Sequence, residues 1–309
     1  MKKILITDKV HDRLREGLIE MGCEVDYFPK MSYQDVRSEV GRYDGLIINS
    51  KVICDRAFLD QVTHLDFIGR LGSGLDIIDL PYAKKVGIEI ISSPEGNANA
   101  VGEHTLGMLI MLLQKLYLAN YTVRESKWIR EKHRGTELSG KKIGIIGYGH
   151  TGPAFAQRLR GFDVEILVYD KYKKIEDDSV STVSLATLLK ESDVVSIHLP
   201  LTDETSELVD QRFLSAMKKG SVIINTSRGN IVQSISVLEA LQSGHLSGAC
   251  LDVLENERPE TWTDHEREIY TALLQRDDVV ATPHVAGWTH RSLRLIAEVL
   301  LEKISIYFD

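Results

Sequence analysis

GIIGYGHTGPAFAQRL, residues 144–159, contains the glycine pattern from which the fold class is inferred. Gly147, Gly149 and Gly152 have the spacing G-x-G-x-x-G, which is weak evidence alone because glycine is common. Its context is stronger, since an apolar run precedes it and a helical pattern follows. Pro153 falls in the first helical turn, where its missing N–H costs little. The stretch therefore predicts a strand, a tight turn and a helix.

The next apolar run ends in VYD and places Asp170 23 residues after Gly147. This is the distance expected for a carboxylate that binds the adenosine ribose of a dinucleotide. The turn, including His150 and Thr151, is then predicted to hold the pyrophosphate at the helix N-terminus. A plain strand-to-helix turn is the alternative. A carboxylate at position 170 favours NAD over NADP, because it binds a free 2′-hydroxyl and repels a 2′-phosphate.

Short runs rich in Ile and Val alternate with helical patterns along the 309 residues, which is typical of parallel α/β sheets covered on both faces. The first third has five strand patterns and residues 141–284 have six. We expect two open parallel-sheet domains, one flavodoxin-like and one a Rossmann domain. Residues 1–98 with 288–309 are predicted to form a discontinuous substrate-binding domain, and residues 99–287 the NAD-binding domain.

Two further helices are expected, at residues 100–124 and 292–308. The first is apolar on most faces and is predicted to be long and largely buried. Its segment 105–119 predicts a homodimer built largely on the cofactor domain. Burial between the two domains of one chain is the alternative.

Composition excludes several function classes. Acidic residues outnumber basic ones, 45 to 37, so the net charge of −8 attracts neither nucleic acid nor an anionic membrane. The apolar part of MKKILITD is too short for a signal peptide, and the apolar tract 106–119 is too short to span a bilayer. Three scattered cysteines have neither metal-type nor paired spacing. A soluble cytoplasmic protein without a metal site is expected.

Four reactive residues follow predicted strands: Arg228, Asp252, Glu257 and His284. Ligands of open parallel sheets bind at the carboxyl ends of the strands. Taken singly, each residue has an ordinary structural explanation. Together they provide a cation for a substrate carboxylate, a histidine acid–base and a carboxylate that orients it. This combination suits hydride transfer to a 2-keto acid.

The chain resembles the D-isomer-specific 2-hydroxyacid dehydrogenase family over nearly its whole length, in GKKIGIIGYGHTG, DVVSIHLPLTDETSELV, MKKGSVIINTSRGNIV, GACLDVLENERP and TPHVAG. The resemblance implies that Arg228 binds the substrate carboxylate and carbonyl. It implies that His284 donates the proton, that Glu257 pairs with His284, and that Asp252 lies near the nicotinamide. Further residues of these segments are expected at the cofactor: His198, Pro200 and Thr226.

The segments GRLGSGLDIIDL and SPEGNANAVGEHTLGM resemble the 3-phosphoglycerate dehydrogenase branch of the family. That branch begins serine biosynthesis, and the resemblance makes 3-phosphoglycerate the first candidate substrate. The residues expected to bind substrate are Ser50, Lys51, Arg70, Gly72, Ser73 and Gly74.

Two positions depart from the family pattern. Asn49 stands where phosphate-handling relatives commonly have Arg, which predicts a weaker hold on a phosphorylated substrate. Arg258 separates Glu257 from Pro259, which are usually adjacent, and this is expected to shift the carboxylate relative to His284.

Other functions stay open at this point. Glyoxylate, hydroxypyruvate or another 2-keto acid is an alternative substrate. An NAD-sensing scaffold similar to the family's transcriptional corepressors is a non-enzymatic alternative, since intact catalytic residues do not exclude it. A Rossmann methyltransferase is a third, although the Arg, Glu and His at the strand ends have no evident role there.

Overall fold

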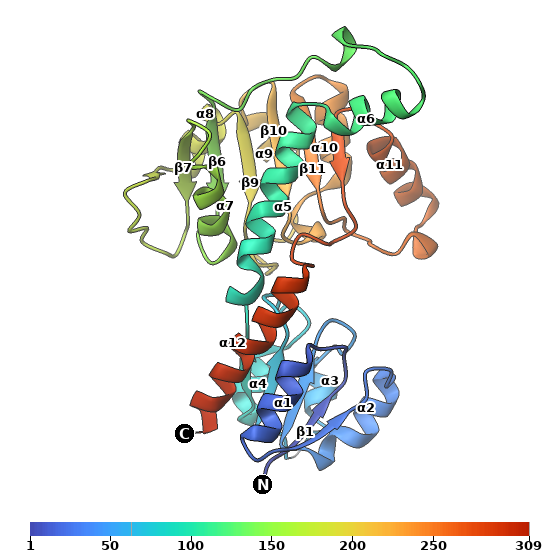
Figure 1. The fold of residues 1–309 in the computed structure, drawn as a ribbon, viewed down its shortest axis with the longest axis vertical. Coiled ribbons are helices and arrows are strands. Elements are labelled where there is room, and N and C mark those ends of the chain that lie inside the picture. The colour runs from blue at the N-terminus through green and yellow to red at the C-terminus, as the bar shows by residue number, and fades with distance from the viewer. Residues whose placement is uncertain (63, 309) are drawn as a thin grey trace. The chain divides into compact units, whose positions relative to one another are not determined.

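The computed structural model describes residues 1–62 and 64–308. The chain divides into two compact units (Figure 1). Residues 1–98 and 288–309 form the first, called here the terminal unit, and residues 99–287 form the second, called the central unit. Residues 63 and 309 lie outside the described part of the chain.

In the described residues of the terminal unit, five parallel strands have the order β2-β1-β3-β4-β5. This is the flavodoxin-like order, as expected. The strands are β1 (Lys3–Ile6), β2 (Glu24–Tyr27), β3 (Gly45–Ile48), β4 (Phe67–Arg70) and β5 (Glu89–Ser92).

Helices cover both faces of this sheet. Alternate side chains of β1 point to opposite faces, so Ile4 and Ile6 pack with α1 and α12, while Leu5 packs with the helices of the other face. Because both faces are covered, most residues of the central strands β1, β3 and β4 are apolar. The helices are α1 (Asp12–Glu20), α2 (Tyr33–Glu39), η1 (Val40–Arg42), α3 (Arg56–Leu59), α4 (Leu80–Val86) and α12 (His290–Phe308).

The sheet of the central unit has seven parallel strands among the described residues, in the order β12-β11-β10-β9-β6-β7-β8. The order reverses between β6 and β9, as in a Rossmann fold, which confirms the predicted class. Six strands were predicted, and β8 was missed because its two residues are polar and exposed. The strands are β6 (Lys142–Ile146), β7 (Glu165–Tyr169), β8 (Ser181–Thr182), β9 (Val194–Ile197), β10 (Ser221–Asn225), β11 (Leu246–Leu251) and β12 (Val279–Ala281).

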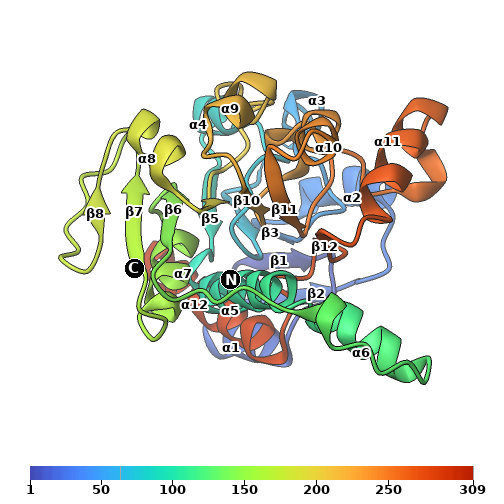
Figure 2. The same cartoon turned by 90° about the horizontal axis from the view of Figure 1, so that it is seen from above.

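Two apolar cores lie on the two faces of this sheet. One core includes side chains of α5 and α7, and the other includes side chains of α8 to α11 (Figure 2). The elements are α5 (Glu95–Leu113), α7 (Thr151–Leu159), α8 (Leu185–Glu191), α9 (Gln211–Ala216), η3 (Gly229–Ile231), α10 (Ser234–Gln242), η4 (Pro259–Thr261) and α11 (Asp264–Leu274). The predicted cofactor turn between β6 and α7 lies beside the strand-order reversal.

The helix predicted at residues 100–124 is broken. Helix α5 ends at Leu113, and α6 (Leu116–Arg124) follows at an angle of 62°. Thr136 donates its backbone N–H to the Leu113 carbonyl, and Lys115 has a left-handed φ of 51°. The apolar pattern does not reveal this break, because it continues across it. The prediction of a single buried helix is wrong for α6, none of whose described residues is buried.

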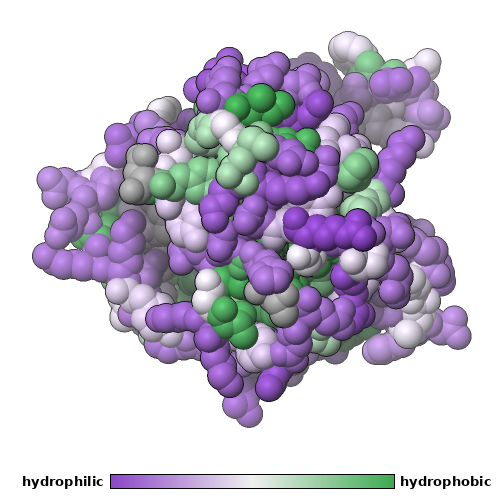
Figure 3. Space-filling model, turned by 90° about the horizontal axis from the view of Figure 1, so that it is seen from below, coloured by the Kyte–Doolittle hydropathy of each residue, from purple (hydrophilic) through white to green (hydrophobic). Residues whose placement is uncertain are grey.

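Apolar side chains are exposed on the segment formed by α6, the following loop and η2 (Glu131–His133), called here the arm. Tyr121 is 61% exposed and Trp128 is 81% exposed. In Figures 1 and 2, α6 projects away from the sheet of the central unit. In contrast, the face seen in Figure 3 is mainly hydrophilic, with small hydrophobic patches.

No single helix in the described part of the chain is long and apolar enough to cross a membrane. The bent pair α5 and α6 reaches the required length and composition only when the two helices are taken together.

Candidate functional site

The three glycines after β6 have different structural roles. Gly147 has φ +90°, and a Cβ there would collide with the His198 carbonyl oxygen. A Cβ at Gly152 would collide with the Gly147 carbonyl, so α7 packs closely on the turn. At Gly149 a Cβ would meet nothing within 4 Å. Gly147 and Gly152 are therefore required by the fold, whereas Gly149 leaves space in which a ligand can approach the backbone.

Helix α7 begins directly after this turn, at Thr151. Its preceding residue, His150, is exposed and makes no side-chain hydrogen bond that caps the helix. The first N–H groups of a helix lack intrahelical acceptors and carry a partial positive charge. An anionic group such as a pyrophosphate fits this end of α7.

Asp170 follows β7 and lies beside the glycine turn. Its carboxylate accepts hydrogen bonds from the backbone N–H groups of Tyr148, Tyr172 and Lys173, at 2.8, 3.0 and 2.9 Å. Burial acts to raise the pKa of Asp170, but these three donors and the Lys173 ammonium outweigh it and hold the pKa below its ordinary value. Asp170 is therefore an ionised acceptor, as ribose binding requires. Lys171 forms an ion pair with Glu204.

His198, at the end of β9, is buried. Its ring nitrogens lie 2.9 Å from the Ser196 hydroxyl and 3.1 Å from the Thr151 hydroxyl. Burial lowers the pKa of His198 to about 3, so the ring is neutral. Through its contact with the Thr151 hydroxyl, the side chain holds the first residue of α7.

Two other predicted cofactor residues also contact protein groups. The Thr226 hydroxyl is buried 3.1 Å from the Thr105 hydroxyl of α5. The Pro200 carbonyl accepts a hydrogen bond from the Thr205 hydroxyl at 2.6 Å.

Glu257 and His284 come together although 27 residues separate them. His284 Nδ1 lies 2.8 Å from Glu257 Oε2, and the two side chains are 43% and 42% exposed. The additional residue Arg258 is exposed, and its N–H is hydrogen-bonded to the Asn256 side chain at 3.1 Å. The insertion thus leaves the carboxylate in contact with the imidazole.

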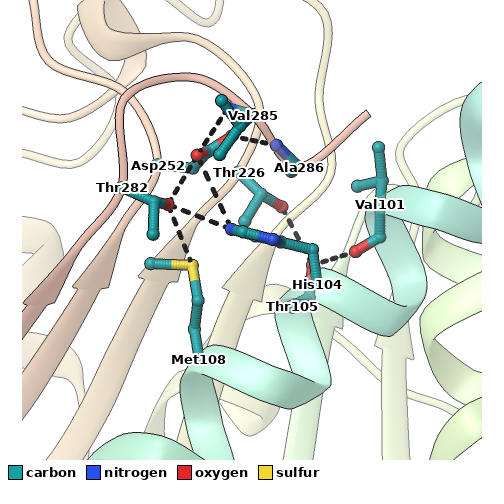
Figure 4. A network of polar contacts seen from close by, with 9 residues as sticks. All are labelled: Val101, His104, Thr105, Met108, Thr226, Asp252, Thr282, Val285 and Ala286. Atoms are coloured by element: carbon teal, nitrogen blue, oxygen red, sulfur yellow. Dashed lines mark hydrogen bonds and ion pairs between the residues drawn. The ribbon is translucent and has the colours of Figure 1, made fainter. Parts of the chain in front are cut away.

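Asp252, after β11, holds the backbone that carries His284. Asp252 is 1% exposed, and its carbonyl accepts the His284 N–H at 2.7 Å. Its carboxylate accepts the N–H groups of Val285 and Ala286 at 2.9 and 2.8 Å (Figure 4). The sequence predicted a cofactor contact for Asp252 and did not indicate this role, because the loop conformation is a tertiary feature.

Arg228 follows β10 in a tight turn and is half-buried. Its Nη1 donates to the Ser227 carbonyl at 2.8 Å, and its own carbonyl accepts from the Asn225 amide at 2.9 Å. The next residue must be glycine, since a Cβ at Gly229 would collide with the Leu254 carbonyl. These contacts fix the backbone that presents the guanidinium.

Arg70 ends β4 in the terminal unit and is buried. Its Nη1 donates to Asn49 Oδ1 at 3.1 Å and to the Leu71 carbonyl. The Asn49 N–H donates in turn to the Asp8 carboxylate at 2.9 Å. Sequence reasoning did not include Asp8, although its position two residues after the end of β1 is a signal that was available.

The remaining predicted substrate residues lie in two loops of the terminal unit. Lys51 donates from Nζ to the carbonyls of Thr7 and Pro29, the latter at 3.0 Å. Gly72 has φ +108° and donates its N–H to the Ser93 hydroxyl at 3.1 Å. The other residues of these loops are exposed or half-buried: Ser50, Ser73 and Gly74.

Within residues 1–62 and 64–308, no group of three or more His, Cys, Asp or Glu side chains is arranged to hold a metal ion. The three cysteines are free and buried. Burial raises the pKa of the Cys54 thiol to about 12 and also raises those of Cys23 and Cys250. None of them has the low pKa of a nucleophilic thiolate.

Comparisons with known proteins show the family of this chain. The sequence model for "D-isomer specific 2-hydroxyacid dehydrogenase, NAD binding domain" matches residues 106–286. A hydroxypyruvate reductase of Thermotoga maritima is 36% identical, covering 96% of this chain and 94% of its own. A D-3-phosphoglycerate dehydrogenase of Archaeoglobus fulgidus is 32% identical over 98% of this chain. The chain spans only 56% of that relative's length.

Among solved structures, a D-lactate dehydrogenase of Aquifex aeolicus, complexed with NAD and lactic acid, superposes with a TM-score of 0.86. It is 28% identical and the match covers 99% of this chain and 95% of that one. The fold and the site thus define a two-unit protein with a Rossmann dinucleotide-binding unit. The chain belongs to the D-isomer-specific 2-hydroxyacid dehydrogenase family, whose cofactor domain binds NAD.

Proposed function

We propose that this protein is an NAD-dependent D-2-hydroxyacid dehydrogenase. The observation that carries the proposal is the 2.8 Å contact between Glu257 and His284 at the strand ends of an NAD-binding unit. An oriented, half-exposed pair of a carboxylate and an imidazole supports proton transfer to or from a bound substrate. In this proposal the central unit binds NAD and the terminal unit binds substrate.

Arg228, His284 and Glu257 each have a separate role in the proposed reduction of a 2-keto acid. Bound NADH supplies the hydride that reduces the carbonyl carbon. The Arg228 guanidinium binds the substrate carboxylate and orients the carbonyl. His284 is held at Nδ1 by Glu257, so its other nitrogen, Nε2, is the one that gives a proton to the carbonyl oxygen. The Glu257 carboxylate stabilises the imidazolium before transfer.

We propose that the protein prefers NAD to NADP. The support is Asp170, an ionised carboxylate beside the glycine turn. A negative charge at this place binds the free 2′-hydroxyl and repels a 2′-phosphate. Specificity constants for NADH and NADPH, measured with the best substrate, test the preference. Similar values for the two cofactors contradict it.

The substrate is proposed to be a short 2-keto acid, and the terminal unit favours an unphosphorylated one. Lys51 is engaged with two backbone carbonyls. Asp8 places a negative charge next to Asn49, which offsets the positive charge that Arg70 brings to the same residue. A phosphate needs cations at its binding site, and it is repelled by a carboxylate. Hydroxypyruvate is therefore tested beside 3-phosphohydroxypyruvate, the oxidised form of the first candidate from the sequence, with glyoxylate as a third substrate.

Oxidation of NADH, followed by absorbance with these three acids, tests the function. We expect turnover, with hydroxypyruvate used better than its phosphorylated analogue. Asn49→Arg is expected to lower KM for 3-phosphohydroxypyruvate, since Arg grips phosphate with a bidentate fork, and to leave KM for glyoxylate unchanged. No gain with the phosphorylated acid means that this loop does not face the phosphate. Tight NADH binding without any turnover favours the corepressor-like alternative.

The protein is also proposed to act as a homodimer in the cytoplasm. Segment 105–119 itself does not support the dimer, because its residues Met108, Leu109 and Leu112 are buried within the central unit. The exposed apolar side chains of the arm now support the dimer. Free buried cysteines suit a reducing compartment.

A further inference from the structure

His104 on α5 belongs to a polar network for which the proposed chemistry gives no role. Its Nε2 lies 3.0 Å from the Thr282 hydroxyl and 3.7 Å from Asp252 Oδ1. Thr282 Oγ1 is 2.6 Å from the same carboxylate oxygen (Figure 4). Three elements thus meet here, because α5, the end of β11 and the end of β12 each contribute one of these side chains.

The chemistry of the groups fixes the direction of each hydrogen bond. Both carboxylate oxygens of Asp252 accept a backbone N–H, so the single hydroxyl proton of Thr282 goes to Asp252 Oδ1, at 2.6 Å. The Thr282 oxygen must then accept from His104, which places a proton on Nε2 of that ring. The N–H groups of Val285 and Ala286 complete the set of donors to Asp252. This buried carboxylate is stable because every neighbour donates to it.

The same carboxylate determines the backbone of the catalytic histidine. His284 has φ +55°, a left-handed conformation that is strained for a non-glycine residue. Consecutive N–H groups of residues 284, 285 and 286 all end on Asp252, the first on its carbonyl and the other two on its carboxylate. A shift of Asp252 therefore moves His284 relative to Glu257.

We propose that His104 is a positioning residue for the proton donor. It acts through Thr282 and Asp252, and keeps the loop at residues 284–286 in the conformation that sets the His284 ring against Glu257. Its own ring does not touch the substrate or the reacting atoms. This inference rests on the proposed function for its kinetic test, and on the hydrogen-bond geometry alone for its spectroscopic test.

Two variants of His104 distinguish a role in hydrogen bonding from a role in packing α5 against its neighbours. His104→Leu fills the space and removes the donor, whereas His104→Gln keeps an N–H donor on a side chain of similar reach. We expect His104→Leu to lower kcat about tenfold, as displaced catalytic groups do, with the dissociation constant of NADH within twofold of wild type. His104→Gln should retain at least half of the wild-type kcat. Equal losses in both variants contradict the proposal, as does a loss confined to NADH binding.

A double-mutant cycle tests whether His104 acts through Thr282. Thr282→Val removes the hydroxyl at constant shape, and Thr282→Ser is its matched control because it keeps the hydroxyl. Thr282→Val should reproduce the loss seen in His104→Leu, and the double variant should be no worse than either single one. Losses that multiply in the double variant mean that the two residues act independently, which overturns the proposal.

A spectroscopic test does not depend on turnover or on any variant. Long-range ¹H–¹⁵N correlation spectra of the wild-type protein, with the His104 signals assigned, report which ring nitrogen carries the proton. We expect a protonated Nε2 on His104. A ring protonated only at Nδ1 refutes the network. If no 2-keto acid is reduced but Nε2 is protonated, the proposed function fails while the network stands.

Discussion

His284 and Glu257 form the contact on which the proposed chemistry depends. Glu257→Gln keeps the size of the side chain but removes the charge that stabilises the imidazolium. We expect kcat/KM for 2-keto acid reduction to fall about a hundredfold, the lower end of general acid–base contributions. Steady-state kinetics at saturating NADH measure this. The control is Glu260→Gln, which changes an exposed carboxylate on η4. Its kcat/KM should stay within twofold of the wild-type value. A Glu257→Gln enzyme within threefold of wild type contradicts the assigned role.

His198 makes stability depend on pH, because burial lowers its pKa to about 3. The unfolded chain takes up a proton at this residue below a pH of about 6.5, whereas the folded chain stays neutral until about pH 3. Acidification through this window therefore favours unfolding. His198 makes no such contribution above the window.

His198→Asn removes this titration. Between pH 6 and 4 we expect the free energy of unfolding to fall less steeply in the variant than in wild type, by about 1.4 kcal/mol per pH unit. Urea unfolding at several pH values gives the slope of the free energy of unfolding against pH for each protein. A destabilisation by the substitution that is the same at every pH does not change this slope. Parallel slopes show that His198 is protonated in the folded protein.

Alanine substitutions of two glycines in the turn between β6 and α7 are expected to have different effects. Gly147→Ala places a Cβ on a backbone with φ +90° and against a carbonyl oxygen, so we expect a loss of stability of about 2–5 kcal/mol. Gly149→Ala meets no protein atom within 4 Å, so the cofactor-free protein should keep its stability. Its NADH dissociation constant should rise about tenfold, because the methyl group occupies space for the pyrophosphate.

Thermal unfolding without cofactor and NADH fluorescence titration distinguish these effects. An unchanged NADH affinity in Gly149→Ala shows that the dinucleotide does not approach this turn. An unchanged melting temperature in Gly147→Ala shows that the turn relaxes without cost.

The exposed apolar side chains of the arm allow a test of the proposed dimer. Two chains that pair through α6 and the following loop bury Tyr121 and Trp128, which are exposed in one chain. We expect light scattering at micromolar concentration to give the mass of two chains, and Tyr121→Asp combined with Trp128→Asp to give the mass of one. Ile306→Asp, at an exposed apolar residue of α12, is the control and should not change the mass. A wild-type monomer contradicts the dimer.

Much of this protein follows from the local sequence. Buried parallel strands read as runs of Ile and Val because both faces of the sheet are covered, so both sheets were predictable. The glycine turn was predictable because its requirements are local: a positive φ at Gly147 and close packing at Gly152. Arg228, Glu257 and His284 could be proposed as site residues because each follows a predicted strand and the carboxyl ends of parallel strands lie at one edge of the sheet. Strand β8 and the break at Lys115 were missed, since a two-residue polar strand has no pattern and the apolar pattern continues through the break.

Tertiary structure alone decided which groups meet. The contact between His284 and Glu257 joins two loops, and spacing along the chain does not reveal whether Arg258 disturbs it. The convergence of three amides on Asp252 and its link to His104 depend on how α5 packs beside β11 and β12. The position of Lys51 on backbone carbonyls depends on neighbouring loops in the same way. Local patterns record which face of an element is buried, whereas hydrogen bonds between distant segments depend on distances that only the folded chain defines.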